Sequence, residues 1–75
     1  MQNKIKEIIT DKMAYESLSV EGAESKYEVK VVSKEFDGMS TIQRHKLIYA
    51  LLDNYIKTGE IHALTIKAKT PSESD

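Results

Sequence analysis

The two histidines, His45 and His62, are the residues of this chain best suited to metal chemistry. The chain has no cysteine, so histidine is the one side chain that can offer an uncharged nitrogen ligand at neutral pH. Any transition-metal site must therefore use His45, His62 or residues of a partner. His45 falls within a helical apolar pattern, and His62 lies near the start of an alternating segment that predicts a strand.

Size and composition indicate one small domain. The 75 residues are 40% hydrophobic and 31% charged, which is typical of an ordinary globular chain. The net charge is −1, and lysines alternate with acidic residues along the sequence. This balance argues against nonspecific nucleic-acid binding, which usually needs a basic face.

Targeting signals are absent from the pattern of apolar residues. The longest apolar run covers residues 47–52, far below the roughly 20 residues that span a bilayer. The first residues carry charges and show no apolar signal region, so we expect no secretory signal and no membrane association. Without cysteines there is no disulfide framework, and a reducing compartment is the expected location: the cytoplasm first, the mitochondrial matrix as the alternative.

The elements that position the histidines begin with a helix and a hairpin. Apolar residues at helical spacing predict an amphipathic helix over residues 3–13, with Asn3 as its N-cap. Alternation then predicts short strands over residues 18–20 and 27–31, joined by a loop over residues 22–25. The glycine in the short connection favours a β-hairpin.

A second helix and a third strand follow. Ser40 and Gln43 have the spacing of a capping box, and Gly59 lies where a C′ glycine would end the helix. Its predicted broad apolar stripe consists of Ile42, His45, Tyr49, Leu52 and Ile56, flanked by Ile48, Leu51 and Tyr55. Residues 61–68 alternate as a strand, with His62 on the face of Leu64. The domain is predicted to span residues 1–71, followed by a frayed polar tail at 72–75.

This order predicts a small α+β domain of α-β-β-α-β topology. The first two strands pair antiparallel, and the strand–helix–strand unit adds the third strand in parallel. Both helices then cover one face of a three-stranded mixed sheet.

Several motifs together resemble the BolA family. Residues 36–38 read FDG, residues 43–49 read QRHKLIY, residues 61–64 read IHAL, and a Thr-Pro pair stands at 70–71. The family pattern has F-x-G, R-H-R/K-x-V/I-Y, I/V-H-A-L and a late T-P in this order. The resemblance covers about residues 27–71 and implies a fold similar to the type II KH fold.

The resemblance also implies a function. BolA-like proteins are accessories in iron–sulfur biology that pair with monothiol glutaredoxins and share a bridging 2Fe–2S cluster, whose other ligands are the glutaredoxin cysteine and a glutathione thiol. The histidine of the I-H-A-L motif, here His62, is one ligand on the BolA side. Some bacterial members are described as DNA-binding regulators of morphology and stress response.

This sequence departs from the family in the loop between the first two strands. That loop usually supplies a second ligand, Cys or His, but residues 21–26 contain neither. Where many members have Ser-His-Phe, this chain has Ser25-Lys26-Tyr27. A protonated lysine is no ligand for iron, so the resemblance implies one ligand, His62, and a labile shared cluster. The tryptophan that commonly follows Thr-Pro is also missing.

Each candidate residue has a structural alternative. His62 could instead be a packed strand residue, and His45 a hydrogen-bonded part of the helix stripe. Arg44 is most simply solvated, although its guanidinium suits a contact with a partner or with a carboxylate of glutathione. Partner contacts are thus predicted for Arg44, His45 and His62.

The rival function is a nucleic-acid-binding regulator on the KH-like scaffold. Its candidate phosphate contacts are Lys34, Arg44 and Lys46. No pattern for a nucleophile with its base, for paired catalytic carboxylates or for a phosphate loop is present, and we expect no enzymatic activity.

Overall fold

The structure, a computed structural model, describes residues 1–74. The elements along the chain are α1 (Gln2–Lys12), β1 (Ser17–Ala23), β2 (Lys26–Val32), the 3-10 turn η1 (Lys34–Phe36), α2 (Thr41–Leu51), α3 (Asp53–Thr58), β3 (Ala63–Lys69) and α4 (Pro71–Ser74). The predicted α-β-β-α-β order is confirmed, with the second helix divided into α2 and α3 and with η1 and α4 added.

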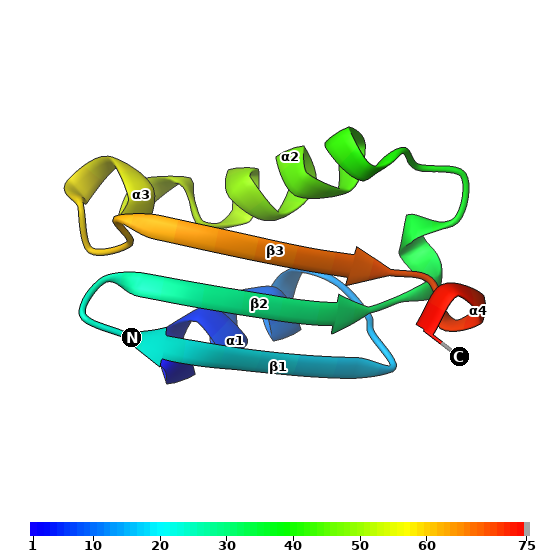
Figure 1. The fold of residues 1–75 in the computed structure, drawn as a ribbon, viewed down its shortest axis with the longest axis horizontal. Coiled ribbons are helices and arrows are strands. Elements are labelled where there is room, and N and C mark those ends of the chain that lie inside the picture. The colour runs from blue at the N-terminus through cyan, green and yellow to red at the C-terminus, as the bar shows by residue number, and fades with distance from the viewer. Residues whose placement is uncertain (75) are drawn as a thin grey trace.

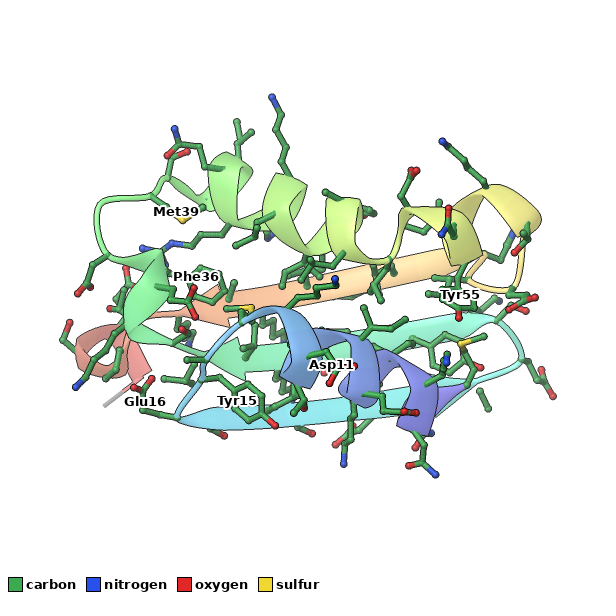
Figure 2. All side chains as sticks on the ribbon, turned by 180° about the vertical axis from the view of Figure 1, so that it is seen from behind. Asp11, Tyr15, Glu16, Phe36, Met39 and Tyr55 are labelled. Carbon is green, nitrogen blue, oxygen red and sulfur yellow. The ribbon has the colours of Figure 1, made fainter. Side chains whose placement is uncertain are left out.

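The three strands form one mixed sheet in the order β1-β2-β3. β1 and β2 are antiparallel, and β2 and β3 are parallel, as predicted. Val20 is opposite Val29, which is opposite Ile66, and all three are buried on one face of the sheet. The helices lie on this face: α1 is behind the strands in Figure 1 and in front of them in Figure 2.

The core fills the space between the sheet and the helices. α1 packs on the β1 side of the sheet and against α2, which in turn packs on β3. Ile5 and Ile9 of α1, Ile48 of α2 and Phe36 of η1 are fully buried. Each such side chain stabilises the fold by about 1.5–3 kcal/mol relative to exposure, so the stability depends on this single layer of contacts.

Two helix signals of the sequence act as predicted. The side chain of Ser40 accepts a hydrogen bond from the backbone N–H of Gln43, and the Gln43 side chain accepts one from the Ser40 N–H. Gly59 ends α3 with φ of 85°, a left-handed conformation that glycine adopts at low cost.

The first helix begins earlier than predicted. The structure starts α1 at Gln2, with Met1 in the N-cap position, so Asn3 is not the cap. The N–H of Ile5 donates to the carbonyl of Met1, which extends the first turn by one residue beyond the predicted start.

The predicted apolar stripe of the second helix was correct for Ile48 and Leu52 and wrong for Ile42 and Tyr49. Ile42 and Tyr49 are exposed, whereas Arg44, Ile48 and Leu52 face the core. The i, i+4 spacing is as expected for a buried face, but that face begins at an arginine. Its burial is possible because the guanidinium donates hydrogen bonds to the carbonyls of Met39 and Ala68 and to the Glu73 carboxylate. The helix also breaks at Leu52, whose N–H is shared between the carbonyls of Ile48 and Tyr49.

Candidate functional site

His62 lies at the surface immediately before β3. The sequence predicted a strand from residue 61. In the structure Ile61 is 2% exposed and donates its N–H to the carbonyl of Tyr55, so it is part of the connection that follows α3. The strand begins at Ala63, which leaves His62 exposed at the junction. The alternative reading of His62 as a packed strand residue is wrong.

The β1–β2 turn lies directly against His62. The N–H groups of His62 and Ala63 both donate to the carbonyl of Ser25, at 2.7 and 3.0 Å. This contact fixes the backbone of His62 while its side chain remains exposed. The loop between β1 and β2, where many family members carry a second ligand, is therefore in direct backbone contact with His62.

This turn has a strained backbone. Glu24 and Ser25 have φ of 53° and 69°, so both central residues of the two-residue turn are left-handed, as in a type I′ hairpin. Such turns usually carry Asn or Gly at these positions, because other residues pay a steric cost there. Gly22 precedes the turn with φ of 118°, and a Cβ added to it would lie 2.1 Å from the Lys26 carbonyl oxygen.

The side chains at this site offer one ligand to a metal ion, the imidazole of His62. Among residues 1–74 there is no group of three or more His, Cys, Asp or Glu side chains that could hold a metal ion. The exposed imidazole of His62 can act as one nitrogen ligand for iron, and the Glu24-Ser25 turn beside it offers neither nitrogen nor sulfur. A 2Fe–2S group would therefore take one ligand from this chain and the others from a partner.

Tyr49 of α2 combines an exposed aromatic side chain with a contact to β3. Its ring is 42% exposed, and its hydroxyl donates to the carbonyl of Leu64, two residues after His62, at 3.3 Å. β3 is an edge strand of the sheet, and Tyr49 contacts this strand at Leu64, close to His62 in sequence.

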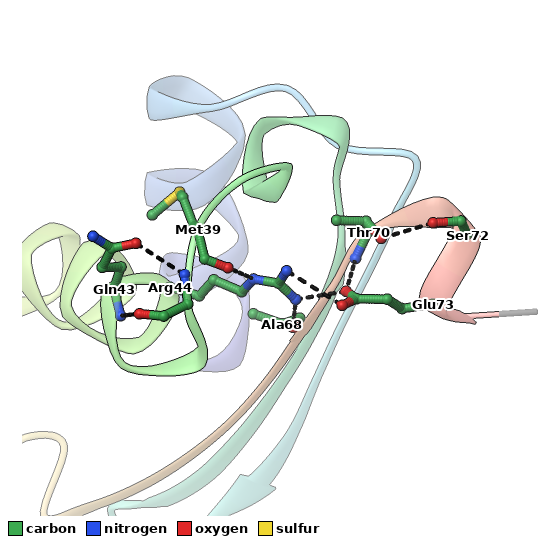
Figure 3. A network of polar contacts seen from close by, with 8 residues as sticks. Met39, Gln43, Arg44, Ala68, Thr70, Ser72 and Glu73 are labelled. Atoms are coloured by element: carbon green, nitrogen blue, oxygen red, sulfur yellow. Dashed lines mark hydrogen bonds and ion pairs between the residues drawn. The ribbon is translucent and has the colours of Figure 1, made fainter.

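Arg44 is at the opposite end of β3 and is buried, contrary to the prediction that it is solvated. It is 9% exposed; its Nε donates to the Met39 carbonyl at 3.0 Å and its Nη1 to the Ala68 carbonyl at 3.1 Å. The guanidinium also forms a two-pronged ion pair with Glu73, with a shortest distance of 2.6 Å (Figure 3). It lies 5.8 Å from the ring centroid of Phe36. Arg44 therefore joins η1, α2, β3 and α4.

The polar tail is ordered by this arginine, which corrects the prediction that residues 72–75 fray; residue 75 lies outside the described residues. Pro71–Ser74 form α4, and the Glu73 carboxylate accepts from Arg44 and from the Thr70 N–H at 2.7 Å. The hydrogen bond with Arg44, followed by that with Thr70, lowers the pKa of Glu73 to about 2. A sequence signal for this helix exists: Thr70, Pro71 and Glu73 have the spacing of an N-cap, N1 proline and capping-box glutamate.

The predicted partner residues do not form one site. Arg44 and His45 lie near the end of β3, and His62 lies about 20 Å away along the strand, at 3.3 Å per residue. His45 is half-buried on α2 beside the exposed Ile42 and Tyr49. Lys34 and Lys46 of the nucleic-acid alternative are exposed, but their third member, Arg44, is engaged within the fold.

The chain matches a family model described as BolA-like protein over residues 3–73. A BolA-like protein of Dictyostelium discoideum is 35% identical over 83 residues, covering 97% of this chain and 73% of the relative. The Acid stress protein IbaG of Escherichia coli is 35% identical over 71 residues, covering 95% of this chain and 84% of that protein.

Solved structures agree with the sequence comparisons. BolA1 from Arabidopsis thaliana superposes with a TM-score of 0.90 at 37% identity, covering 99% of this chain and 95% of that one. The BolA domain of SufE1 from the same plant superposes with a TM-score of 0.88 at 36% identity, covering 96% and 93%. Within the described residues, no helix has the length and apolar character needed to cross a membrane.

Proposed function

Because the chain belongs to the BolA family, we propose that it is a non-enzymatic accessory in iron–sulfur cluster trafficking and redox regulation that binds a monothiol glutaredoxin. Proteins of this family are generally regulatory or accessory. The similarity to the BolA domain of SufE1 is consistent with a role in iron–sulfur biology.

The observation that carries the proposal is the exposed side chain of His62 at the junction before β3. In the complex, His62 supplies the one ligand of this chain to a 2Fe–2S cluster, and the glutaredoxin cysteine and a glutathione thiol supply ligands from the other side. Histidine ligation raises the reduction potential of such a centre relative to all-thiolate ligation. The Ser25 carbonyl holds the backbone of His62, so the ring is presented from a fixed position.

The edge of β3 next to His62 and Tyr49 is the docking surface for the glutaredoxin in this proposal. Tyr49 gives this edge an aromatic contact, held by its hydrogen bond to the Leu64 carbonyl. Exposed tyrosines are favoured in protein interfaces because they bury a large area at a small entropic cost. His45, next to Tyr49 on the outward side of α2, is a further contact residue.

The test is reconstitution of iron and sulfide with this protein, a monothiol glutaredoxin and glutathione, followed by visible absorption and circular dichroism. His62→Ala should change the cluster spectrum and shorten the lifetime of the cluster, because the remaining ligands come from the partner side alone. His45→Ala removes the other imidazole of the chain; it should lower the yield of the complex, but the cluster that forms should have the wild-type spectrum, because His45 supplies no ligand. A His62→Ala spectrum identical to wild type would remove His62 from the ligand set.

A gain-of-ligand variant tests the same geometry in the opposite direction. Lys26 occupies the position of the histidine in many family members, and it is the register partner of Ala63, the residue after His62. Lys26→His should therefore lengthen the cluster lifetime in air by several-fold, whereas Lys26→Gln should leave the lifetime unchanged. Equal lifetimes for the two variants would show that this turn does not face the cluster.

A further inference from the structure

The uncovered face of the sheet carries a cluster of basic and hydroxyl side chains at one end. A depression of about 390 Å³ lies there, and its walls include Ser17, Ser19, Lys30, Val32, Lys67 and Lys69. The face of the sheet that is turned toward the viewer in Figure 1 is the one that α1 and α2 do not cover. Of the residues around the depression, Ser17 and the three lysines are exposed, and Ser19 and Val32 are half-buried.

The strand register brings three lysines together. Ser19, Lys30 and Lys67 form one row across the sheet, and Ser17, Val32 and Lys69 form the next. Neighbouring strands are about 4.8 Å apart and the rows about 7 Å apart, so three ammonium groups share one small area. Lysines directly opposite each other repel, and Lys30 and Lys67 are such a pair.

Only part of this charge is compensated within residues 1–74. Glu28 lies in the adjoining row, with its carboxylate 3.4 Å from Lys30 Nζ and 3.9 Å from Lys67 Nζ. Both lysines are about half exposed, at 49% and 54%, so these ion pairs are weak. No described carboxylate lies within ion-pair distance of Lys69.

We infer that this depression binds a small ligand that carries two or more phosphoryl groups. Three lysine ammonium groups and two serine hydroxyls are hydrogen-bond donors, and lysine binds phosphate as a point charge. The volume of the depression is in the range of small-molecule sites.

The distribution of acidic residues restricts the occupant to a small anion. Glu21 and Glu28 are opposite each other in the row directly beyond Lys30 and Lys67. A nucleic-acid strand that followed the sheet face would have to cross these carboxylates, whereas a di- or triphosphate fits within the basic end. This site is independent of His62, which lies before the other end of β3.

The test is a titration of ¹⁵N-labelled protein with inorganic triphosphate, observed by two-dimensional NMR. The amide signals of Ser17, Ser19, Lys30, Lys67 and Lys69 should shift saturably, and the signal of His62 should not. The double variant Lys67→Ala/Lys69→Ala should weaken binding about tenfold or more, and Glu28→Gln should tighten binding about twofold, because it removes a competing anion.

The matched control is Lys6→Ala/Lys46→Ala, which removes the same charge from exposed positions on α1 and α2. Its affinity for triphosphate should stay within about twofold of wild type, since the loss of distant charge acts only through a screened field. Equal weakening by the two double variants, or shifts that do not saturate, would overturn the proposal. Tighter binding of a single-stranded oligonucleotide than of triphosphate, with shifts along the whole sheet face, would also overturn it.

Discussion

At the end of β3, Arg44 is 9% exposed and its guanidinium is bonded to two backbone carbonyls and to Glu73, whereas before the start of β3 the side chain of His62 is exposed. Among the described residues, no side chain hydrogen-bonds to the His62 ring. Both residues belong to motifs of the family pattern, and the sequence predicted partner contacts for both. Of two motif residues at opposite ends of one strand, Arg44 thus stabilises the fold and His62 remains available for binding.

The largest expected effect is on stability when each of the two residues is truncated. Arg44→Ala should lower the free energy of unfolding by about 3 kcal/mol, because it leaves the Met39 and Ala68 carbonyls without their charged donor. His62→Ala should change it by no more than about 0.5 kcal/mol, as expected for an exposed side chain. Urea denaturation of both variants measures the difference, and equal losses of stability would contradict the structural role of Arg44.

An intermediate effect is expected in the turn beside His62. Ser25→Gly should raise the free energy of unfolding by about 1 kcal/mol, because glycine adopts the left-handed conformation of this position without steric cost. Ser25→Ala is the control, since it removes the hydroxyl and keeps the Cβ, and it should not stabilise. Thermal unfolding followed by circular dichroism separates the two; stabilisation by both would mean that backbone strain is not the cause.

The smallest effect on stability is expected from protonation of Glu73 at low pH, which removes its ion pair with Arg44. The pKa of Glu73 is lowered from 4.5 to about 2, so its ion pair stabilises the fold fully above about pH 4.5 and is lost as the pH falls toward about 2. Wild-type protein should therefore lose α4 packing over this range. Glu73→Gln should show a weaker pH dependence of unfolding between these values, measured by denaturation at a series of pH values. Parallel wild-type and variant curves would contradict the assignment of the ion pair to this transition.

Much of the fold can be predicted from signals between residues that are close in sequence. The Ser40–Gln43 capping box and the helix-ending Gly59 are formed by residues close in sequence, and alternation in the strands reports the two faces of a sheet directly. The element order then left few topologies, and the mixed sheet that follows from it is the one observed.

Two errors, the exposure predicted for Arg44 and the fraying predicted for the tail, have one physical origin, which is long-range pairing. The buried face of α2 includes Arg44 because its guanidinium meets partners 24 and 29 residues further along the chain. Hydrophobic periodicity treats arginine as solvent-exposed and isoleucine as buried. The predicted stripe of the second helix therefore included Ile42 and left out Arg44. The anchoring of Glu73 was missed for the same reason, although its capping-box spacing was visible in the sequence.

Residue types and short-range spacing were enough to predict the family and the order of helices and strands, and they singled out His62 as the candidate metal ligand. Tertiary structure decided which polar residues are free to act, because the guanidinium of Arg44 is neutralised by Glu73 while the turn at Ser25 holds only the backbone of His62. Tertiary structure also brought Lys30, Lys67 and Lys69 onto one face, since only the pairing of β2 with β3 makes lysines 37 residues apart neighbours.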